Sequence, residues 1–158
     1  MQSWRSAAAA AIKGGSWKSF FTGRPIAGEA LAGMARNVRA KAAEVLTPGA
    51  RVLDVGGGSG AVARVLLENC AAYTAVELSD KELERVRVLG AERGVAVRTH
   101  SMEALDIGIL EPGFDLIVLN SVVENFPGCN YLRRVLDKAA GLLREGGILL
   151  VGMVWDSG

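Results

Sequence analysis

The sequence has little of what marks several large classes of protein. Its two cysteines, Cys70 and Cys129, match no metal-ligand or redox spacing, which is typical of a reducing compartment. The 18 Lys and Arg residues nearly balance the 17 Asp and Glu residues, so no basic field indicates nucleic acid or a membrane surface. No segment reaches the roughly 20 apolar residues that a membrane-spanning helix needs. These absences predict a cytoplasmic protein without a metal site, a membrane contact or a nucleic-acid partner.

What the sequence has in abundance is apolar residues and glycine. Half of the chain is apolar and 20 of its 158 residues are glycine, which bounds it to one domain of α/β size. Short apolar runs alternate with segments of helical composition, and this predicts right-handed crossovers and a doubly wound parallel sheet covered on both faces. The predicted strands are 51–55, 72–77, 95–100, 114–119 and 147–154, the predicted helices are 28–46, 60–70, 80–92 and 129–144, and the crossover 101–113 is irregular. Residues 1–25 are expected to form a leader or lid segment, and residues 26–158 the domain itself.

A glycine loop follows the first predicted strand directly. It consists of Gly56, Gly57, Gly58, Ser59 and Gly60. Glycines allow backbone N–H groups and a helix N-terminus to approach a ligand closely, which predicts a nucleotide-type cofactor. The spacing fits the dinucleotide form G-x-G-x-x-A as well as a G-x-G-x-G form, so the glycines leave the cofactor open. Asp54, just before the loop, favours a cationic ligand, because a buried carboxylate needs a partner and would repel a pyrophosphate.

A second carboxylate ends the next predicted strand. Glu77 lies 17 residues after Gly60, at the tip of the strand 72–77. A carboxylate at this position can accept hydrogen bonds from both hydroxyls of a ribose, although a solvated strand end is the plainer alternative. The segment from Ser79 to Glu82 is typical of a capping box that opens a helix.

Several segments, in this order, resemble a class I S-adenosylmethionine-dependent methyltransferase. They are Val-Leu-Asp-Val-Gly-Gly-Gly-Ser-Gly at 52–60, Ala-Val-Glu-Leu-Ser at 75–79, Phe-Asp-Leu-Ile-Val-Leu-Asn at 114–120 and Glu-Gly-Gly at 145–147. Two more, Trp-Lys-Ser-Phe-Phe-Thr-Gly-Arg-Pro-Ile at 17–26 and Asn-Ser-Val-Val-Glu-Asn-Phe-Pro at 120–127, are similar to the methyltransferase domains of nonribosomal peptide and polyketide synthetases. The chain departs from that pattern at Phe21, Glu124 and Asn125, where these domains have tyrosine, glutamine and tyrosine.

The resemblance implies a role for each residue of the cofactor site. The loop 56–60 would hold the methionine part and the ribose, with Asp54 acting on the amino group through water or the backbone. Glu77 would take the ribose hydroxyls and Leu78 would pack on the adenine. Met102 and Glu103 fall where the family reads adenine, with Ser101 as an alternative acceptor. Asn120 would offer its backbone carbonyl to the methionine ammonium.

The acceptor side is expected around the segment after the fourth strand. A sulfonium methyl group is already activated, so a base matters only if the acceptor arrives protonated. Glu124 is the catalytic candidate, although it could equally orient the acceptor or be a structural acid, and His100 is expected to be structural. The substrate candidates are Phe21, Ser121, Asn125 and Phe126.

The sequence therefore predicts S-adenosylmethionine-dependent methyl transfer to a small-molecule or carrier-bound acceptor. A nicotinamide-dependent oxidoreductase and a catalytically inactive scaffold domain are the alternatives. The final apolar run 148–155 predicts a strand buried on both faces. In the family two further strands follow, which this chain lacks, so we expect the strand edge to pair in a homo-oligomer or within a longer chain.

Overall fold

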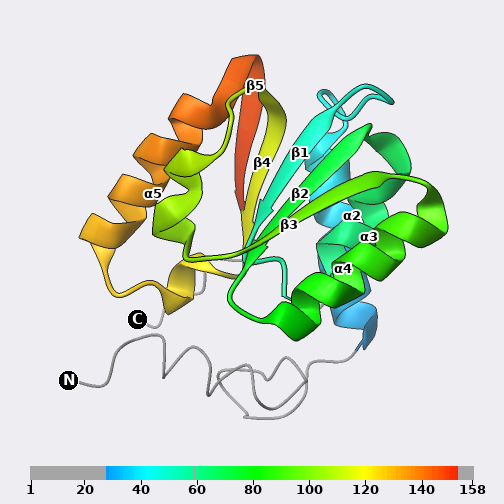
Figure 1. The fold of residues 1–158 in the computed structure, drawn as a ribbon, viewed down its shortest axis with the longest axis horizontal. Helices are drawn as coiled ribbons and strands as arrows, with labels where there is room; N and C mark the ends of the chain where they lie inside the picture. The colour runs from blue at the N-terminus through cyan, green and yellow to red at the C-terminus, as the bar shows by residue number, and fades with distance from the viewer. Residues whose placement is uncertain (1–27, 59, 153–158) are drawn as a thin grey trace.

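The fold is known from a computed structural model, which describes residues 28–152 except Ser59. Five strands form one sheet in the order β3-β2-β1-β4-β5, and every neighbouring pair is parallel (Figure 1). The strands are β1 (Arg51–Val55), β2 (Ala72–Glu77), β3 (Ala96–Ser101), β4 (Phe114–Asn120) and β5 (Leu143–Gly152). The strand order reverses between β1 and β4, as in a doubly wound α/β sheet. The predicted fold class is confirmed, and the described sheet is wholly parallel.

Helices cover both faces of this sheet (Figure 1). On one face lie α2 (Gly28–Ala42), α3 (Ala61–Leu66) with its 3-10 extension η1 (Leu67–Asn69), and α4 (Asp80–Arg93). On the other lie η2 (Ala104–Ile109) and α5 (Cys129–Leu142), and the short η3 (Val123–Asn125) follows β4. Because strand side chains alternate, β1 supplies Val52 to the core under α2–α4 and Leu53 to the core under α5. The central strands are thus buried on both sides.

The Ser79 half of the predicted capping box at α4 is confirmed, whereas the Glu82 carboxylate accepts from Arg85. The Ser79 hydroxyl accepts a hydrogen bond from the Glu82 backbone N–H at 3.4 Å, which satisfies one of the donors at the helix start. Gly94 ends the helix in the left-handed region with a φ of 66°. This helix packs on β2 and β3 and thereby sets the position of the β2 tip.

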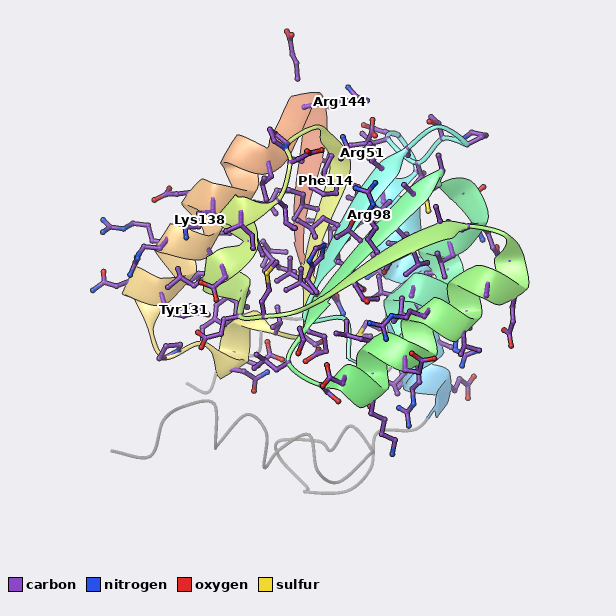
Figure 2. All side chains as sticks on the ribbon, viewed as in Figure 1. Arg51, Arg98, Phe114, Tyr131, Lys138 and Arg144 are labelled. Atoms are coloured by element: carbon purple, nitrogen blue, oxygen red, sulfur yellow. The ribbon has the colours of Figure 1, made fainter. Side chains whose placement is uncertain are left out.

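The amino ends of β1 and β4 are held together by a separate cluster. Arg51 lies over the Phe114 ring, with 5.0 Å between the guanidinium carbon and the ring centroid, and Asp115 accepts the Arg51 backbone N–H at 2.7 Å. Arg144 also binds Asp115. Figure 2 shows Arg51, Phe114 and Arg144 together at one end of the sheet. This cluster therefore stabilises the amino ends of the strands and does not occupy the opposite end of the sheet, where the strands finish.

The structure departs from the sequence-based boundaries in several places. The helix predicted over 129–144 ends at Leu142, and the last strand begins at Leu143 instead of at position 147. The first helix ends at Ala42, the second predicted helix divides into α3 and η1, and the irregular crossover contains η2. The expectation that the last strand is buried on both faces holds for Leu150 and is wrong for Val151, which is 41% exposed. The reason is that β5 forms an edge of the described sheet, where fewer neighbours cover it. Positions 153–155 of that predicted strand lie outside the described residues.

Close packing of α4 on β3 requires a glycine. A Cβ at Gly90 would lie 2.1 Å from Val97 Cγ2, whereas a Cβ at Gly141 in α5 would meet nothing within 4 Å. We predict that Gly90→Ala lowers the free energy of unfolding by about 1–3 kcal/mol through overpacking. Gly141→Ala, the control, should raise it by about 0.5–1 kcal/mol, because alanine loses less backbone entropy in a helix. Urea unfolding followed by circular dichroism measures both, and equal effects would contradict this packing.

Candidate functional site

The carboxyl ends of β1, β2 and β4 bring most of the predicted site residues together. Asp54 is in register with Ala75 of β2 and Val118 of β4, at the point where the strand order reverses. Ligands of open parallel sheets bind outside the strand ends at such a point. Glu77 ends β2 and Asn120 ends β4, so both flank the loop that follows β1.

The loop after β1 has a backbone that glycine alone adopts readily. Gly56, Gly58 and Gly60 have φ values of 74°, 51° and 77°, all in the left-handed region. Gly60 precedes α3, and Ala61 is the first residue of that helix. The three left-handed glycines follow the G-x-G-x-G spacing, and Ala61 at the start of α3 fits the last position of G-x-G-x-x-A as well. The predicted site residue Ser59 lies outside the described residues.

The same loop is packed tightly between two neighbours. A Cβ at Gly57 would lie 2.2 Å from Asp54 Oδ2, and a Cβ at Gly56 would lie 2.4 Å from Val122 Cγ2. Every residue other than glycine carries a Cβ, so no choice of side-chain rotamer at either position would relieve this overlap. The glycines thus let the loop backbone lie against the Asp54 carboxylate on one side and the segment after β4 on the other.

Asp54 is a buried carboxylate that the described chain satisfies only in part. It is 1% exposed, and its Oδ2 accepts a hydrogen bond from the Tyr73 hydroxyl at 2.6 Å. Its Oδ1 accepts no hydrogen bond within the described chain. The pKa of Asp54 is raised to about 6: burial raises it most, the Tyr73 hydrogen bond lowers it, and the charge of Glu77 raises it. A buried acceptor of this kind is costly, which is typical of an atom that meets a donor from a ligand.

Glu77 is fixed over the glycine loop by backbone donors. Its Oε2 accepts the Gly58 N–H at 3.2 Å, and its Oε1 accepts the Leu78 N–H at 2.7 Å. An ionised carboxylate has about four acceptor positions, so both oxygens can still accept from a ligand. The side chain is half-buried, as is that of Leu78 beside it. Glu77 is therefore an oriented group rather than a freely solvated strand end.

The end of β4 carries a second buried oxygen without a donor. Asn120 is 5% exposed, and its Nδ2 donates to Met34 Sδ at 3.2 Å and to Ser121 Oγ at 3.4 Å. The Asn120 Oδ1 accepts no hydrogen bond within the described chain. Because Asn120 is two residues beyond Val118, the register partner of Asp54, both polar side chains lie on the face covered by α2–α4. Ser121 has a φ of 53°, an uncommon value for a residue with a side chain.

Glu103 belongs to a different group of contacts, on the α5 side. Its Oε2 accepts from the Tyr131 hydroxyl at 3.5 Å, and that hydroxyl accepts the Leu105 N–H at 3.2 Å. Lys138 donates to the Leu105 carbonyl at 2.5 Å, which ties η2 to α5. Figure 2 shows Tyr131 and Lys138 along α5. Glu103 and the half-buried Met102 before it are thus positioned by the crossover after β3 rather than by the glycine loop.

The predicted acceptor residues are divided between surface and interior. Glu124 and Asn125 are exposed on η3, whereas Ser121 is buried against Met34. The Phe126 ring is half-buried, with its centroid 4.9 Å from that of Tyr131. Partial desolvation raises the pKa of Glu124, and a hydrogen bond to its own backbone N–H lowers it. Phe21 lies outside the described residues.

Three residues of this region were missed by sequence reasoning. Tyr73 and Met34 contact Asp54 and Asn120, and Tyr131 contacts Glu103. The sequence signal for Tyr73 is weak, a phenol hydroxyl in a mostly apolar strand, and its partner Asp54 is determined only by the register of β1 and β2. Met34 and Tyr131 read as ordinary core positions of helices.

Within the described part of the chain, no helix is long and apolar enough to cross a membrane. Those same residues bring together no group of three His, Cys, Asp or Glu side chains that could hold a metal ion.

Comparison with known proteins relates this arrangement to one family and to several curated proteins. Residues 53–151 match the family model described as "Methyltransferase domain". The probable nonribosomal peptide synthetase CymA of Salinispora arenicola is 40% identical over 144 residues, which are 90% of this chain and 2% of that protein. The ubiquinone biosynthesis O-methyltransferase of Xanthomonas campestris is 32% identical over 111 residues, 70% of this chain and 45% of that enzyme. The chain spans less than half the length of either relative.

Solved structures share the fold. The N-methyltransferase NodS of Bradyrhizobium japonicum superposes with a TM-score of 0.66 at 20% identity, covering 79% of this chain and 71% of NodS. The sugar N-methyltransferase KedS8 of Streptoalloteichus superposes with a TM-score of 0.64 at 25% identity, covering 80% of this chain and 50% of KedS8.

The pKa of Asp54 makes a prediction about stability. Because it is about 6 in the folded chain and 3.8 ordinarily, the folded state binds the extra proton, and stability falls as the pH rises between these values. We predict that Asp54→Asn raises the free energy of unfolding at pH 7 by about 1–3 kcal/mol and removes this pH dependence.

The control for that measurement is Asp115→Asn, at the other end of the sheet. Burial opposes its ionisation, but the Arg51 N–H and Arg144 lower the pKa of Asp115. Its stabilising effect is present above the ordinary pKa of an aspartate and is lost as the pH falls, so Asp115→Asn should destabilise the chain at pH 7. Urea unfolding between pH 4 and 8 measures both variants. A loss of stability in both would contradict the claim that the buried Asp54 carboxylate lowers the free energy of unfolding at pH 7.

Proposed function

This chain belongs to the family of class I S-adenosylmethionine-dependent methyltransferase domains, and from that premise we propose that it transfers the methyl group of S-adenosylmethionine to a small-molecule or carrier-bound acceptor. The observation that carries the proposal is the buried Asp54 carboxylate, which lies against the glycine loop with one oxygen that no described group satisfies. The cofactor would bind at the carboxyl ends of β1, β2 and β4.

The unsatisfied oxygens fit the amino-acid end of this cofactor. Asp54 Oδ1 and Asn120 Oδ1 are both buried acceptors, on the same face of neighbouring strands. An ammonium group has three donors and a positive charge, so it can satisfy both oxygens and offset the burial of Asp54. The pyrophosphate of a nicotinamide dinucleotide offers no donor to these two oxygens and would meet the negative charge of Asp54, whereas a carboxylate at the position of Glu77 suits the ribose of either cofactor. This supports the methyltransferase rather than the oxidoreductase alternative.

The remaining cofactor groups have candidate partners along the strand ends. Glu77, oriented by the Gly58 and Leu78 N–H groups, is proposed to accept the two ribose hydroxyls. Leu78 and Met102 offer half-buried apolar surface for the adenine ring. Glu103 is proposed to accept from the adenine amine, with Ser101 as the alternative.

Methyl transfer requires little of the protein beyond positioning the acceptor and the methyl group. When bound, S-adenosylmethionine supplies a sulfonium methyl group already activated for transfer. The chain's part is to hold the acceptor in line with that group and to exclude water. Glu124, on η3 after β4, is proposed either to take a proton from the acceptor or to orient it, and its raised pKa makes it a better base than an ordinary glutamate. Asn125, exposed beside Glu124 on η3, and the half-buried Phe126 that follows are proposed to contact the acceptor, as is Ser121 just after β4.

The acceptor class is supported by the relatives. A carrier-bound acceptor follows the similarity to CymA, a nonribosomal peptide synthetase. The relatives include proteins named as N-methyltransferases and as O-methyltransferases, so nitrogen and oxygen acceptors both belong in an assay. A reducing compartment such as the cytoplasm suits the free thiols of Cys70 and Cys129. We also propose that the outer edge of β5 pairs with a further strand, of this chain's own longer form or of a second copy.

Glu77 provides the first test of the cofactor site. We predict that Glu77→Ala weakens binding of S-adenosylhomocysteine, the demethylated product, by about 1–3 kcal/mol, because charge-assisted hydrogen bonds to the ribose are lost. Glu84→Ala is the control, since Glu84 forms an exposed ion pair with Arg87 on α4. Calorimetric titration measures both affinities. Equal binding by parent and Glu77→Ala would remove the ribose assignment, and a parent that bound NAD in preference would overturn the proposed function.

Glu124 tests the acceptor side and separates an active enzyme from a scaffold. We predict that Glu124→Gln lowers turnover and leaves cofactor affinity nearly unchanged, because the exposed Glu124 side chain is proposed to serve the acceptor rather than the cofactor. Glu111→Gln, in an exposed turn before β4, is the control. Transfer of a radiolabelled methyl group to a panel of amine and hydroxyl acceptors gives the turnover. Undiminished transfer by Glu124→Gln would make Glu124 a structural acid, and cofactor binding without transfer to any acceptor would favour the scaffold.

A further inference from the structure

We propose that Tyr73 is a positioning residue of the cofactor site, whose hydroxyl holds the Asp54 carboxylate in the charged form and in the orientation that ligand binding requires. The proposal rests on the proposed function, because the ligand is S-adenosylmethionine or its demethylated product. Tyr73 itself touches no proposed cofactor group, and it acts through Asp54.

The geometry gives Tyr73 a fixed hold on the carboxylate. The distance between the Tyr73 hydroxyl and Asp54 Oδ2 is 2.6 Å, typical of a hydrogen bond from a neutral hydroxyl to a charged oxygen. The register pairs Tyr73 with Val52 and Asp54 with Ala75, so Tyr73 and Asp54 are diagonal neighbours on the same sheet face. Tyr73 is completely buried in the core under α2–α4. Packing around the ring therefore determines where the hydroxyl lies.

The direction of the hydrogen bond favours the charged form of Asp54. A phenol donates its proton to an ionised carboxylate, and burial together with the negative charge of Asp54 raises the pKa of Tyr73 well above its ordinary value. Tyr73 is thus a neutral donor throughout the working pH range. With Oδ2 occupied by this donor, Oδ1 is the oxygen presented to the ligand.

The other described groups around Asp54 do not favour its ionised form. Glu77 raises the pKa of Asp54 through its negative charge, and the Cys70 thiol acts on Tyr73 rather than on Asp54. On α4, the buried Glu82 is paired with Arg85 at 2.8 Å. The charged side chains that α2 and α3 carry are exposed to solvent: Glu29, Arg36, Arg39, Lys41 and Arg64. Tyr73 is therefore the described group that favours the ionised carboxylate before a ligand arrives.

A dependence of binding on pH follows from this arrangement. If the ionised form of Asp54 binds the ligand ammonium, affinity falls about tenfold for each pH unit below the pKa of Asp54, which is about 6. Removing the Tyr73 hydroxyl should move this midpoint upward by about one pH unit, in proportion to the lost charge-assisted hydrogen bond.

The test compares Tyr73→Phe with the parent by calorimetric titration of S-adenosylhomocysteine from pH 5 to 8. We expect about fivefold weaker binding by the variant near pH 6, about tenfold weaker binding near pH 5, and converging affinities near pH 8. Ionisation of the ligand is common to both proteins and cancels. Thr74→Val is the matched control, because Thr74 is the next residue of β2, its side chain lies on the opposite sheet face, and it is similarly buried. It should follow the parent at every pH.

A second readout needs no ligand. The carbon-13 shift of the Asp54 carboxyl, followed by NMR, should titrate at higher pH in Tyr73→Phe than in the parent. An unchanged Asp54 titration, or a ligand affinity reduced equally at all pH values, would overturn the proposal. A parent that fails to bind S-adenosylhomocysteine would instead overturn the proposed function. If Tyr73→Phe does not fold, 3-fluorotyrosine placed at position 73 keeps the ring and donates more strongly, so the midpoint should move downward, and an unmoved midpoint would reject the role.

Discussion

The carboxyl end of the sheet is arranged around one buried charge, the carboxylate of Asp54. Burying a carboxylate is unfavourable unless partners replace its water, and the described chain gives it one donor, Tyr73. The glycine loop depends on the same group, because a Cβ at Gly57 would overlap Asp54 Oδ2. A domain selected for stability alone would place an apolar residue at this position, as at Val52 two residues earlier on the same face. The cost in stability is instead consistent with a site completed by a ligand.

The charges at the strand ends decide what kind of ligand can complete it. Glu77 is close enough to Asp54 for its charge to raise the pKa of Asp54, and the acceptor oxygen of Asn120 lies on the same face as Asp54. Three left-handed glycines bring backbone N–H groups to the same place, so the loop resembles those that bind phosphates. The carboxylate decides between the two ligand classes, because it repels phosphate and attracts an ammonium. The methyltransferase family and this local electrostatic argument therefore agree independently.

The parts of the site that sequence could predict are those built from adjacent residues. The strand–loop–helix unit, the carboxylate before the loop and the strand-end positions of Glu77 and Asn120 follow from local patterns, since a parallel sheet brings its strand ends to one edge. Contacts between distant segments could not be predicted in this way. The pairing of Tyr73 with Asp54 depends on strand register, and the Met34 contact with Asn120 depends on how α2 packs. The exposure of Val151 likewise depends on what lies beside β5, which an apolar run does not specify.

The central claim is that the buried Asp54 carboxylate is kept for a cationic group of the cofactor. A thermodynamic cycle tests it most directly, with the parent and Asp54→Asn each titrated with S-adenosylhomocysteine and with its analogue lacking the amino group. The account predicts a coupling of about 1.5–3 kcal/mol between the Asp54 carboxylate and the ligand amino group, the range of a hydrogen bond to a charged group. Losing the amino group should then matter far more to the parent than to Asp54→Asn. A coupling near zero, with both proteins losing affinity equally, would contradict the account.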